Sequence, residues 1–348
     1  MRIVVTGASG NVGTAVVRKL VAHDAVDEVV GICRRPHDWR PARTRWVHLD
    51  VATDELAPTL AGADAVIHLA WLFQPTHQPD VTWRANVLGT QRLLAAVEAA
   101  GVPAVVVASS VGAYSPRTSL DPVDESWPTM GYAGAAYSRE KSYVERMLDH
   151  HEALHPHRRV VRMRPAFIFQ QWAALEQRRL FLGPFVPHAL LVRGRLPVLP
   201  LPRELHLQAL QADDVAAAYA EAALRSVHGA FNLGTDVLDP GAIGEALGSR
   251  WLPMPAAMMK GVVTAAFQAH LVPASPGLFE LALRIPMLSS ERARRELGWS
   301  PGFDARGAIG EFLQGIGRGE DGPTPPLAAS TSGPARSLEV AAGVGERP

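Results

Sequence analysis

The sequence predicts an α/β protein whose main domain is a doubly wound parallel sheet, followed by a smaller C-terminal substrate-binding region. Two observations lead to this prediction. Strand-like hydrophobic runs alternate with helix-like runs over the first half of the chain, as a parallel sheet with crossover helices requires. The first such pair is joined by a glycine-rich turn, TGASGNVG at residues 6–13, which is typical of a strand-to-helix turn that binds a phosphate group.

The first strand is predicted over residues 3–5, because this β-branched run is bounded by glycine. The helix that follows places four apolar residues on one face: Val16, Val17, Leu20 and Val21. A turn between these elements lets the backbone approach a ligand closely, and the start of the helix offers unpaired N–H groups to an anion. The alternative is a turn whose glycines serve packing alone. We expect the dinucleotide site to be lined by Gly7, Gly10, Asn11, Val12 and Gly13.

Five further strands are predicted from hydrophobic runs at residues 28–35, 45–51, 63–70, 103–110 and 159–169. Beyond these runs the alternation of strand-like and helix-like segments stops, and proline-rich and arginine-rich segments follow. We therefore expect a dinucleotide-binding domain over residues 1–165, to which segments near 207–235 return, and a substrate-binding region over 166–317. Residues 318–348 are rich in Gly, Pro, Ala and Ser, which predicts a disordered tail.

Composition narrows the class of protein. The chain has 348 residues, with Lys+Arg 34 against Asp+Glu 34, so it lacks the basic surplus expected of a nucleic-acid binder. The single cysteine, Cys33, excludes an internal disulfide and a cysteine metal cluster, and the N-terminus does not read as a secretory signal; a cytoplasmic location is expected. Residues 256–272 are apolar but include Lys260 and are short for a membrane span. We expect a buried or lid helix there, with contact to a membrane surface as the alternative.

The candidate catalytic residues lie in two segments. Tyr137 and Lys141 are four residues apart in a segment with helical periodicity, so their side chains share a face, and a lysine ammonium near a phenol is expected to lower the phenol pKa. Such a pair can transfer a proton, although this spacing is also common on solvated helices. Ser109 and Ser110 end the fifth predicted strand, at the edge where parallel sheets bind ligands.

Nine ordered segments of the sequence resemble the extended short-chain dehydrogenase/reductases, also called the NAD-dependent epimerase/dehydratase family. The resemblance covers roughly residues 1–315. The matching segments are TGASGNVG, HLAW at 68–71, NVLGT at 86–90, SSVGAY at 109–114, YSREK at 137–141, RPAFIF at 164–169, DDVAAAY at 213–219, FNLGT at 231–235 and RRELGWSP at 294–301.

The resemblance implies a Rossmann-type fold and a mechanism. Tyr137 is expected to be the general acid or base, Lys141 to hold the nicotinamide ribose and keep the phenol acidic, and Ser110 to hydrogen-bond the reacting oxygen. Related proteins are often dimers through helices that include the YxxxK helix, so a homodimer is expected. Further cofactor contacts implied by the motifs are Asp50, Val51, Leu69, Ala70, Asn86, Ser109 and Pro165.

The end of the second predicted strand bears on cofactor choice. A carboxylate there binds the ribose 2′-OH of NAD, whereas a nearby arginine accommodates the 2′-phosphate of NADP. This sequence has Cys33 in that place, followed by Arg34 and Arg35, and a guanidinium is a good phosphate ligand. We therefore expect NADP in preference to NAD; the alternative is that both arginines are only solvated.

Substrate identity is less constrained. Residues 158–207 contain nine arginines and two glutamates, which suit an anionic substrate such as a sugar nucleotide or simply cover a surface. Phe169 and Gln170 replace the tyrosine and glycine usual after RPxx in the sugar-nucleotide branch, and nearby Trp, Leu and Pro residues suit an apolar substrate.

HEALH at 151–155 matches the HExxH zinc motif. It lies at the end of the Tyr137 helix and precedes Pro156, so we expect a solvated helix end and no metal.

Two classes of function remain open at this stage. One is an enzyme with nicotinamide chemistry: a carbonyl reductase or dehydrogenase, or an epimerase or dehydratase such as a sugar-nucleotide epimerase. The other is a catalytically silent NAD(P)-sensing regulator. The complete set of Ser110, Tyr137 and Lys141 favours the enzyme, because a sensor has no need of a proton relay.

Overall fold

The computed structural model describes residues 1–74, 76–183, 185, 192, 194–320, 322–328 and 344. Among these residues, seven parallel strands form one sheet in the order β10-β6-β5-β4-β1-β2-β3, which confirms the predicted doubly wound α/β fold. The order reverses between β1 and β4, where such sheets bind ligands. The strands are β1 Arg2–Thr6, β2 Glu28–Cys33, β3 Thr44–His48, β4 Ala65–His68, β5 Ala104–Ala108, β6 Arg159–Pro165 and β10 Gly229–Leu233.

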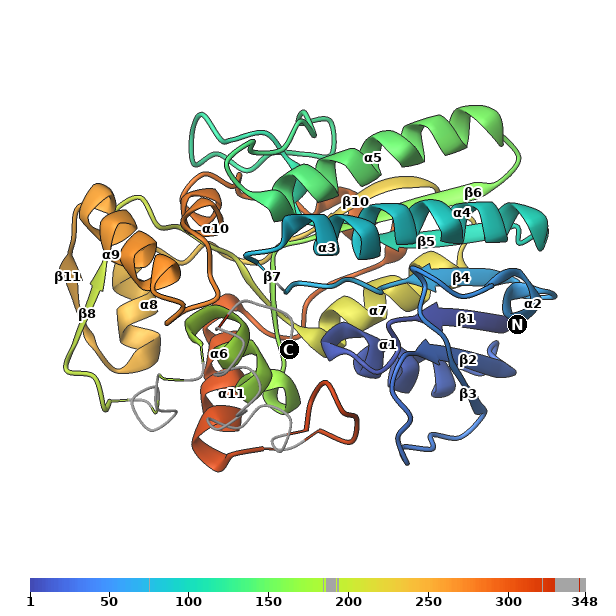
Figure 1. The fold of residues 1–348 in the computed structure, drawn as a ribbon, viewed down its shortest axis with the longest axis horizontal. Helices are drawn as coiled ribbons and strands as arrows, with labels where there is room; N and C mark the ends of the chain where they lie inside the picture. Colours follow the sequence, from blue (N-terminus) through green and yellow to red (C-terminus); the bar gives the residue numbers. More distant parts are fainter. Residues whose placement is uncertain are drawn as a thin grey trace.

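Helices cover both faces of this sheet (Figure 1). On one face lie α1 (Asn11–Val21) and α7 (Ala212–Leu224), and on the other α2 (Ala57–Leu60), α4 (Gly89–Ala99) and α5 (Ala136–Leu154). The alternation of side chains along β1 separates the two cores. Ile3 and Val5 belong to the cluster that includes α1 and α7, whereas Val4 belongs to the cluster that includes α4 and α5.

The predicted strand at 159–169 is two strands in different sheets, so that expectation was wrong. After β6 the backbone N–H of Ala166 donates to the carbonyl of Leu233, and the next N–H, that of Phe167, donates to the carbonyl of Gln208. The chain thereby leaves the main sheet, and β7 (Phe167–Phe169) pairs in parallel with β9 (Ala209–Gln211). Hydrophobicity continues across this change of partner, so the run of apolar residues gives no sign of it.

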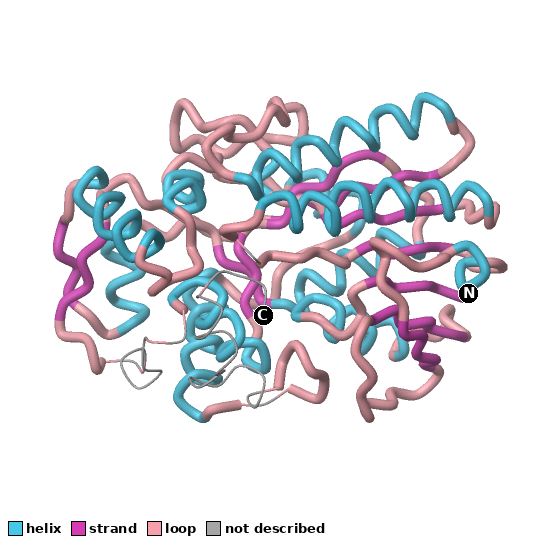
Figure 2. Tube along the Cα trace, in the orientation of Figure 1, coloured by secondary structure: helices cyan, strands magenta, loops and turns pink. Residues whose placement is uncertain are grey.

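A second region lies beyond the carboxyl edge of the main sheet (Figures 1 and 2). Its small core joins Ala209 and Leu238 to residues of α8 and α11. Between β4 and β6 come the short elements α3 (Pro79–Trp83), η1 (Arg84–Leu88) and η2 (Val111–Ala113). The remaining elements are η3 Gln171–Ala173, α6 Ala174–Leu182, β8 Val198–Leu201, α8 Pro240–Leu247, β11 Arg250–Pro253, α9 Ala256–Gln268, α10 Pro276–Ala282, η5 Ala293–Leu297 and α11 Ala305–Arg318.

Two segments bear on earlier expectations. The expectation of a buried helix over residues 256–272 was wrong, because helix α9 has no buried side chain; the lid and the membrane-surface alternatives stay predictions. No described helix combines the length and apolarity needed to cross a bilayer. The expected disordered tail lies mostly outside the described residues. Its segment 322–328, however, packs against the dinucleotide loop: Thr324 is 1% exposed, and its hydroxyl donates to the Ser9 carbonyl at 2.7 Å.

Candidate active site

The glycine-rich turn joins β1 to α1 at the switch point of the sheet. Gly7 has φ +68°, and a Cβ there would meet the backbone of Ala70, 2.7 Å from its nitrogen. A Cβ on Gly13 would strike the backbone of Gly7 and Ala8. These two positions therefore require glycine if strand, turn and helix are to pack this closely.

The start of α1 fits a pyrophosphate. Gly10 is the N-cap and supplies no side-chain hydrogen bond to the helix, so the N–H groups that begin at Asn11 and Val12 face an anion site with the positive end of the helix dipole behind them. Leu69 and Ala70 follow β4 beside this turn, where the Leu69 N–H donates to the Thr6 carbonyl at 3.1 Å. The structure thus brings together the predicted loop residues of β1 and β4.

The predicted adenosine end lies after β2 and β3. The Arg34 guanidinium is 3.9 Å from the Asp50 carboxylate, and both side chains are partly exposed. Val51 lies against the start of α4, where a Cβ on Gly89 would be 3.4 Å from its side chain. Cys33 is buried, with its sulfur 3.5 Å from His48 Nδ1, and burial raises the pKa of its thiol.

Helix α5 carries the predicted catalytic pair and is tied to η2. The Ser138 hydroxyl donates to the Gly112 carbonyl at 2.5 Å and accepts from the Tyr132 N–H at 2.7 Å. Ser110, the N-cap of η2, accepts from the Gly112 N–H. These bonds hold the start of α5, and with it Tyr137, next to Ser110.

The expectation that Lys141 lowers the pKa of Tyr137 is not met in this structure. Burial raises the pKa of the Tyr137 phenol to about 12; the hydrogen bond with Ser110 acts in the opposite sense, and the charge of Glu140 raises the value further. The Lys141 ammonium instead donates to the Ala108 carbonyl at 2.7 Å and lies 3.3 Å from the centre of the Trp71 ring. Burial lowers the pKa of Lys141 to about 7.

Two further predicted cofactor contacts have structural partners. The Ser109 hydroxyl donates to Glu145 at 2.5 Å. Asn86 accepts from the Leu72 N–H at 2.6 Å, donates to the Leu72 carbonyl at 2.8 Å, and donates to Glu140 at 2.7 Å. Asn86 therefore joins the loop after β4 to helix α5.

A buried ion-pair network joins helix α5 to strand β6 behind the site. Arg164 binds the Glu145 carboxylate through Nε at 2.8 Å and Nη2 at 2.9 Å, and donates to the Tyr114 hydroxyl at 2.9 Å, which donates to Asn232. Burial alone would raise the pKa of Glu145, but Arg164 holds it below its usual value. Pro165, the last predicted contact, follows Arg164 at the end of β6.

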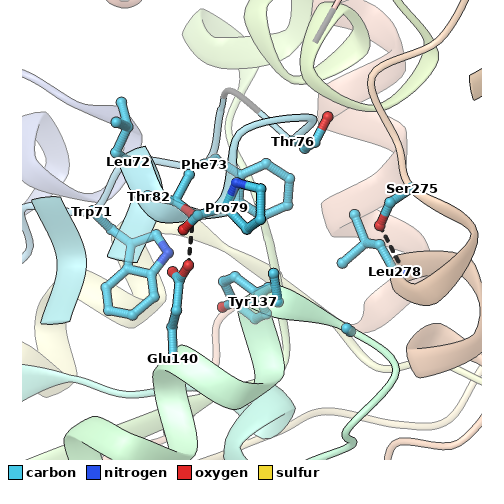
Figure 3. Close-up of a pocket in the computed structure, with 12 residues that line it drawn as sticks. Trp71, Leu72, Phe73, Thr76, Pro79, Thr82, Tyr137, Glu140, Ser275 and Leu278 are labelled. Carbon is cyan, nitrogen blue, oxygen red and sulfur yellow. Dashed lines mark hydrogen bonds between the residues drawn. The ribbon is translucent and has the colours of Figure 1, made fainter. Parts of the chain in front are cut away.

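The pocket beside Tyr137 is small, with a cavity volume of about 40 Å³, and it opens to solvent. Its walls are mostly apolar, with one buried carboxylate, that of Glu140 (Figure 3). Trp71 and Phe73 pack on the Tyr137 ring, with centroids 5.9 and 5.5 Å away. The residues that line the pocket are Trp71, Leu72, Phe73, Thr76, Pro79, Thr82, Ala135, Ala136, Tyr137, Glu140, Ser275 and Leu278.

Several of these lining residues were missed by the sequence reasoning. Glu140 could have been found from the sequence, because it lies three residues after Tyr137 and so on the same side of the helix. Thr82 and Ser275 belong to loops and short helices distant in sequence, and no spacing pattern connects them to Tyr137.

Several arginines of the segment 158–207 form hydrogen bonds or ion pairs within the protein. Arg159 donates to the carbonyls of Ala222 and Ala223, and Arg162 pairs with Glu145, Asp149 and Glu152. Arg164 belongs to the network above, Arg179 pairs with Glu176, and Arg193 lies outside the described residues. At least four of the nine arginines of this segment are therefore bound within the protein, which weakens the idea that the segment as a whole receives an anionic substrate.

The HExxH match does not form a metal-ligand arrangement in the described part of the chain. Glu152 pairs with Arg162, and His155 Nε2 lies 3.5 Å from Glu98. The His151 and His155 rings are 4.6 Å apart at the end of α5. Of the described residues, no group of three or more His, Cys, Asp or Glu side chains is placed to hold a metal ion.

The sequence model of the NAD dependent epimerase/dehydratase family matches residues 3–234, more than half of the chain. The chain belongs to this family. Its fold is similar to that of MoeE5, solved in complex with UDP-glucuronic acid and NAD, with a TM-score of 0.67 and 20% identity, covering 92% of this chain and 100% of that one.

Two curated relatives match over part of their length. A dihydroflavonol 4-reductase-like protein of Synechocystis sp. is 30% identical over 145 residues, 40% of this chain and 42% of that protein. The 4-hydroxy-2-methyl-3-oxo-4-farnesyl-3,4-dihydroquinoline-1-oxide ketoreductase of Stigmatella aurantiaca is 31% identical over 173 residues, 49% of this chain and 51% of that protein. The chain thus matches about half the length of these relatives.

Proposed function

We propose that the protein is an NAD(P)-dependent oxidoreductase that transfers a hydride at a hydroxyl or carbonyl carbon, with Tyr137 as the acid and base. The observation that carries this proposal is the hydrogen bond between Ser110 and Tyr137 at the carboxyl edge of the sheet. Tyr137 also lines an apolar pocket, and the start of α1, which fits a pyrophosphate, lies at the same edge. Family membership supports it.

The residues of this chain would have the following roles in the reaction. When bound, a nicotinamide dinucleotide supplies or accepts the hydride. Tyr137, whose pKa is raised to about 12, is protonated at neutral pH and donates its proton to a carbonyl oxygen, and Ser110 donates a hydrogen bond to the same oxygen. Lys141, held at the Ala108 carbonyl, binds the ribose. The apolar walls exclude water from the reacting carbon.

We further propose NADP as the preferred cofactor, whereas the structural neighbour is solved with NAD. Two features support NADP. Cys33 stands at the end of β2 in place of a carboxylate, and Arg34 lies 52% exposed beside Asp50, from where its guanidinium can reach a 2′-phosphate. Asp50 competes for the same guanidinium, so the preference depends on Arg34 exchanging partners.

A neutral, apolar carbonyl compound is the substrate class that we propose. The pocket is lined mainly by aromatic and aliphatic side chains and carries a carboxylate in place of a cationic group, which disfavours an anionic ligand. One curated relative is named as a ketoreductase of a farnesylated quinoline oxide. A sugar-nucleotide epimerase is the second candidate, because the structural neighbour is solved with UDP-glucuronic acid.

The test combines nucleotide identification with a substrate panel. The purified protein is denatured, any released nucleotide is identified by mass spectrometry, and NADPH and NADH are titrated into cofactor-free protein. Aryl and alkyl ketones and UDP-glucose are then supplied with each nucleotide. Ketone-dependent NADPH oxidation supports the proposal, whereas retained NAD and conversion of UDP-glucose to its epimer support the second candidate.

Three predictions about the whole protein remain to be tested with the same material. A nucleotide-sensing regulator without catalysis would bind the cofactor and turn over no substrate. A homodimer would appear in sedimentation at the mass of two chains. A cytoplasmic location and the absence of nucleic-acid binding follow from composition alone and need fractionation and binding assays.

A further inference from the structure

Glu140 is a buried carboxylate in the pocket that the reaction outlined above does not use. It lies three residues after Tyr137 on α5, is 3% exposed, and lines the same pocket. Figure 3 shows its carboxylate and the Tyr137 ring on one wall, beneath Thr82 of the short helix α3. A carboxylate in so dry a place requires hydrogen bonds.

Two residues from other elements hold the carboxylate in position. The Thr82 hydroxyl donates to one oxygen at 2.6 Å, and the Asn86 amide donates to the other at 2.7 Å. Asn86 is itself clamped to both backbone groups of Leu72. The position of the charge relative to Tyr137 is therefore set by three elements: α5, α3 and η1.

The same bonds accommodate a neutral side chain at this position. The Thr82 hydroxyl also lies 3.0 Å from the Pro79 carbonyl, and its one proton serves a single acceptor at a time. When Glu140 is ionised, that proton can point to the carboxylate. When the side chain carries a hydrogen, Thr82 can accept it and donate to Pro79. A glutamine can therefore replace Glu140 with its oxygen accepting from Asn86 and one of its N–H groups donating to Thr82.

Other charged and titratable groups also act on this wall. Arg139 and Lys141 favour the ionised form of Glu140, while burial raises its pKa. His68 is neutral, because burial lowers its pKa to about 3, and burial keeps the Tyr219 hydroxyl protonated. Arg139 and Lys141 thus act on Glu140 and Tyr219 interacts with Tyr137, whereas His68 interacts with Lys141.

We propose that Glu140 is a positioning residue whose carboxylate keeps the Tyr137 hydroxyl protonated to a higher pH, which extends carbonyl reduction into the alkaline range. The proposal rests on the function proposed above. In that reduction the carbonyl carbon gains a hydride from the reduced nicotinamide, the carbonyl π pair moves to oxygen and takes the Tyr137 proton, and solvent returns a proton to the phenolate. A negative charge beside the phenol opposes its ionisation.

The test compares the wild type with Glu140→Gln and Glu140→Asp. The pH dependence of kcat/KM is measured for ketone reduction and for oxidation of the product alcohol. In Glu140→Gln we expect the alkaline fall of reduction and the alkaline plateau of oxidation to move together to lower pH by about one unit. They move together because a variant cannot change the overall equilibrium at a given pH. Glu140→Asp keeps the negative charge, so its pH profiles are expected to lie close to those of the wild type.

A second readout needs neither substrate nor cofactor. Tyrosine labelled with ¹³C at Cζ reports ionisation by NMR, and Tyr137→Phe identifies the resonance among the five tyrosines. The Tyr137 midpoint is expected to fall by about one unit in Glu140→Gln. Thr82→Val removes one hydrogen bond but leaves Glu140 ionised at the alkaline pH at which Tyr137 titrates, so its Tyr137 midpoint is expected to stay at the wild-type value, and it serves as the matched control.

The outcomes separate the two proposals. An unchanged or higher Tyr137 midpoint in folded Glu140→Gln overturns the role of Glu140, whatever the activity. A midpoint that falls equally in Thr82→Val overturns it too, because that variant keeps the charge of Glu140. A lowered midpoint, in a protein that turns over none of the ketones or alcohols, overturns the proposed function. A midpoint lowered in Glu140→Gln but not in Thr82→Val, together with matching shifts of both pH profiles, supports both.

Discussion

The Glu145–Arg164 pair lies behind the catalytic helix, and breaking it is expected to destabilise the whole fold. The Glu145 side chain has no solvent exposure and that of Arg164 has 5%. Arg164→Met removes two bonds to the carboxylate and one to Tyr114. Loss of one partner from a buried pair typically costs 3–5 kcal/mol. Because Arg162 and Ser109 remain bonded to Glu145, we expect about 3 kcal/mol, at the lower end of that range.

The assay is urea unfolding at two pH values. In the wild type the pKa of Glu145 is lowered by folding, so its contribution to stability is present above the unfolded-state pKa and is lost as pH falls through the folded one. In Arg164→Met the pKa of Glu145 is expected to rise, so acid protonates the isolated carboxylate and relieves the penalty. The stability gap between the two proteins should therefore narrow from pH 7 to pH 5.

The double variant Glu145→Gln/Arg164→Met completes the test. It leaves no uncompensated charge, so it should be more stable at pH 7 than Arg164→Met alone. The assignment of this pair as a desolvated ion pair would be refuted if the wild type and Arg164→Met differed by under about 1 kcal/mol in the free energy of unfolding at pH 7, or if that difference grew in acid.

Three further predictions concern the cofactor site and the proton donor. Tyr137→Phe should lower kcat by about 10²- to 10⁴-fold, the usual contribution of acid-base catalysis, while cofactor titration gives an unchanged Kd. Arg34→Gln should weaken NADPH binding by about tenfold, the loss of one charge-assisted bond, and leave NADH binding unaltered; equal losses for both would contradict the NADP preference. Truncation after residue 320 removes the buried Leu327 and should lower the free energy of unfolding by about 2 kcal/mol, measured by urea unfolding.

The parts of the fold that depend on local periodicity could be predicted from the sequence. The β1 run and the glycine turn give a strand, a close approach and a helix within about twenty residues. The division of Ile3, Val4 and Val5 between two cores is seen only in the structure, because all three residues are apolar. The exchange of sheets after Pro165 could not be predicted, because it is decided by which distant carbonyls, those of Leu233 and Gln208, accept from the chain.

The candidate site was predictable in its residue types and less so in its electrostatics. The i,i+4 spacing relates Tyr137 to Lys141 correctly along the helix. Spacing carries no information about what lies between two side chains, and here the Trp71 ring covers the ammonium while Glu140 adds a negative charge. The arginine-rich segment failed as a guide for the same reason, since composition does not reveal that Glu145 binds Arg164 internally.

The Trp71 indole over Lys141 bears on how tightly a nucleotide can be held. If Lys141 binds the ribose as proposed, the incoming hydroxyls and the indole compete for one ammonium. A desolvated cation–π contact contributes about 2 kcal/mol, which corresponds to an affinity reduced by about thirtyfold when it must be given up. A leucine at position 71 would leave the ammonium uncovered. Weak retention of the nucleotide is the property of a protein that exchanges it in every cycle, and under the proposed function Trp71 would favour that exchange.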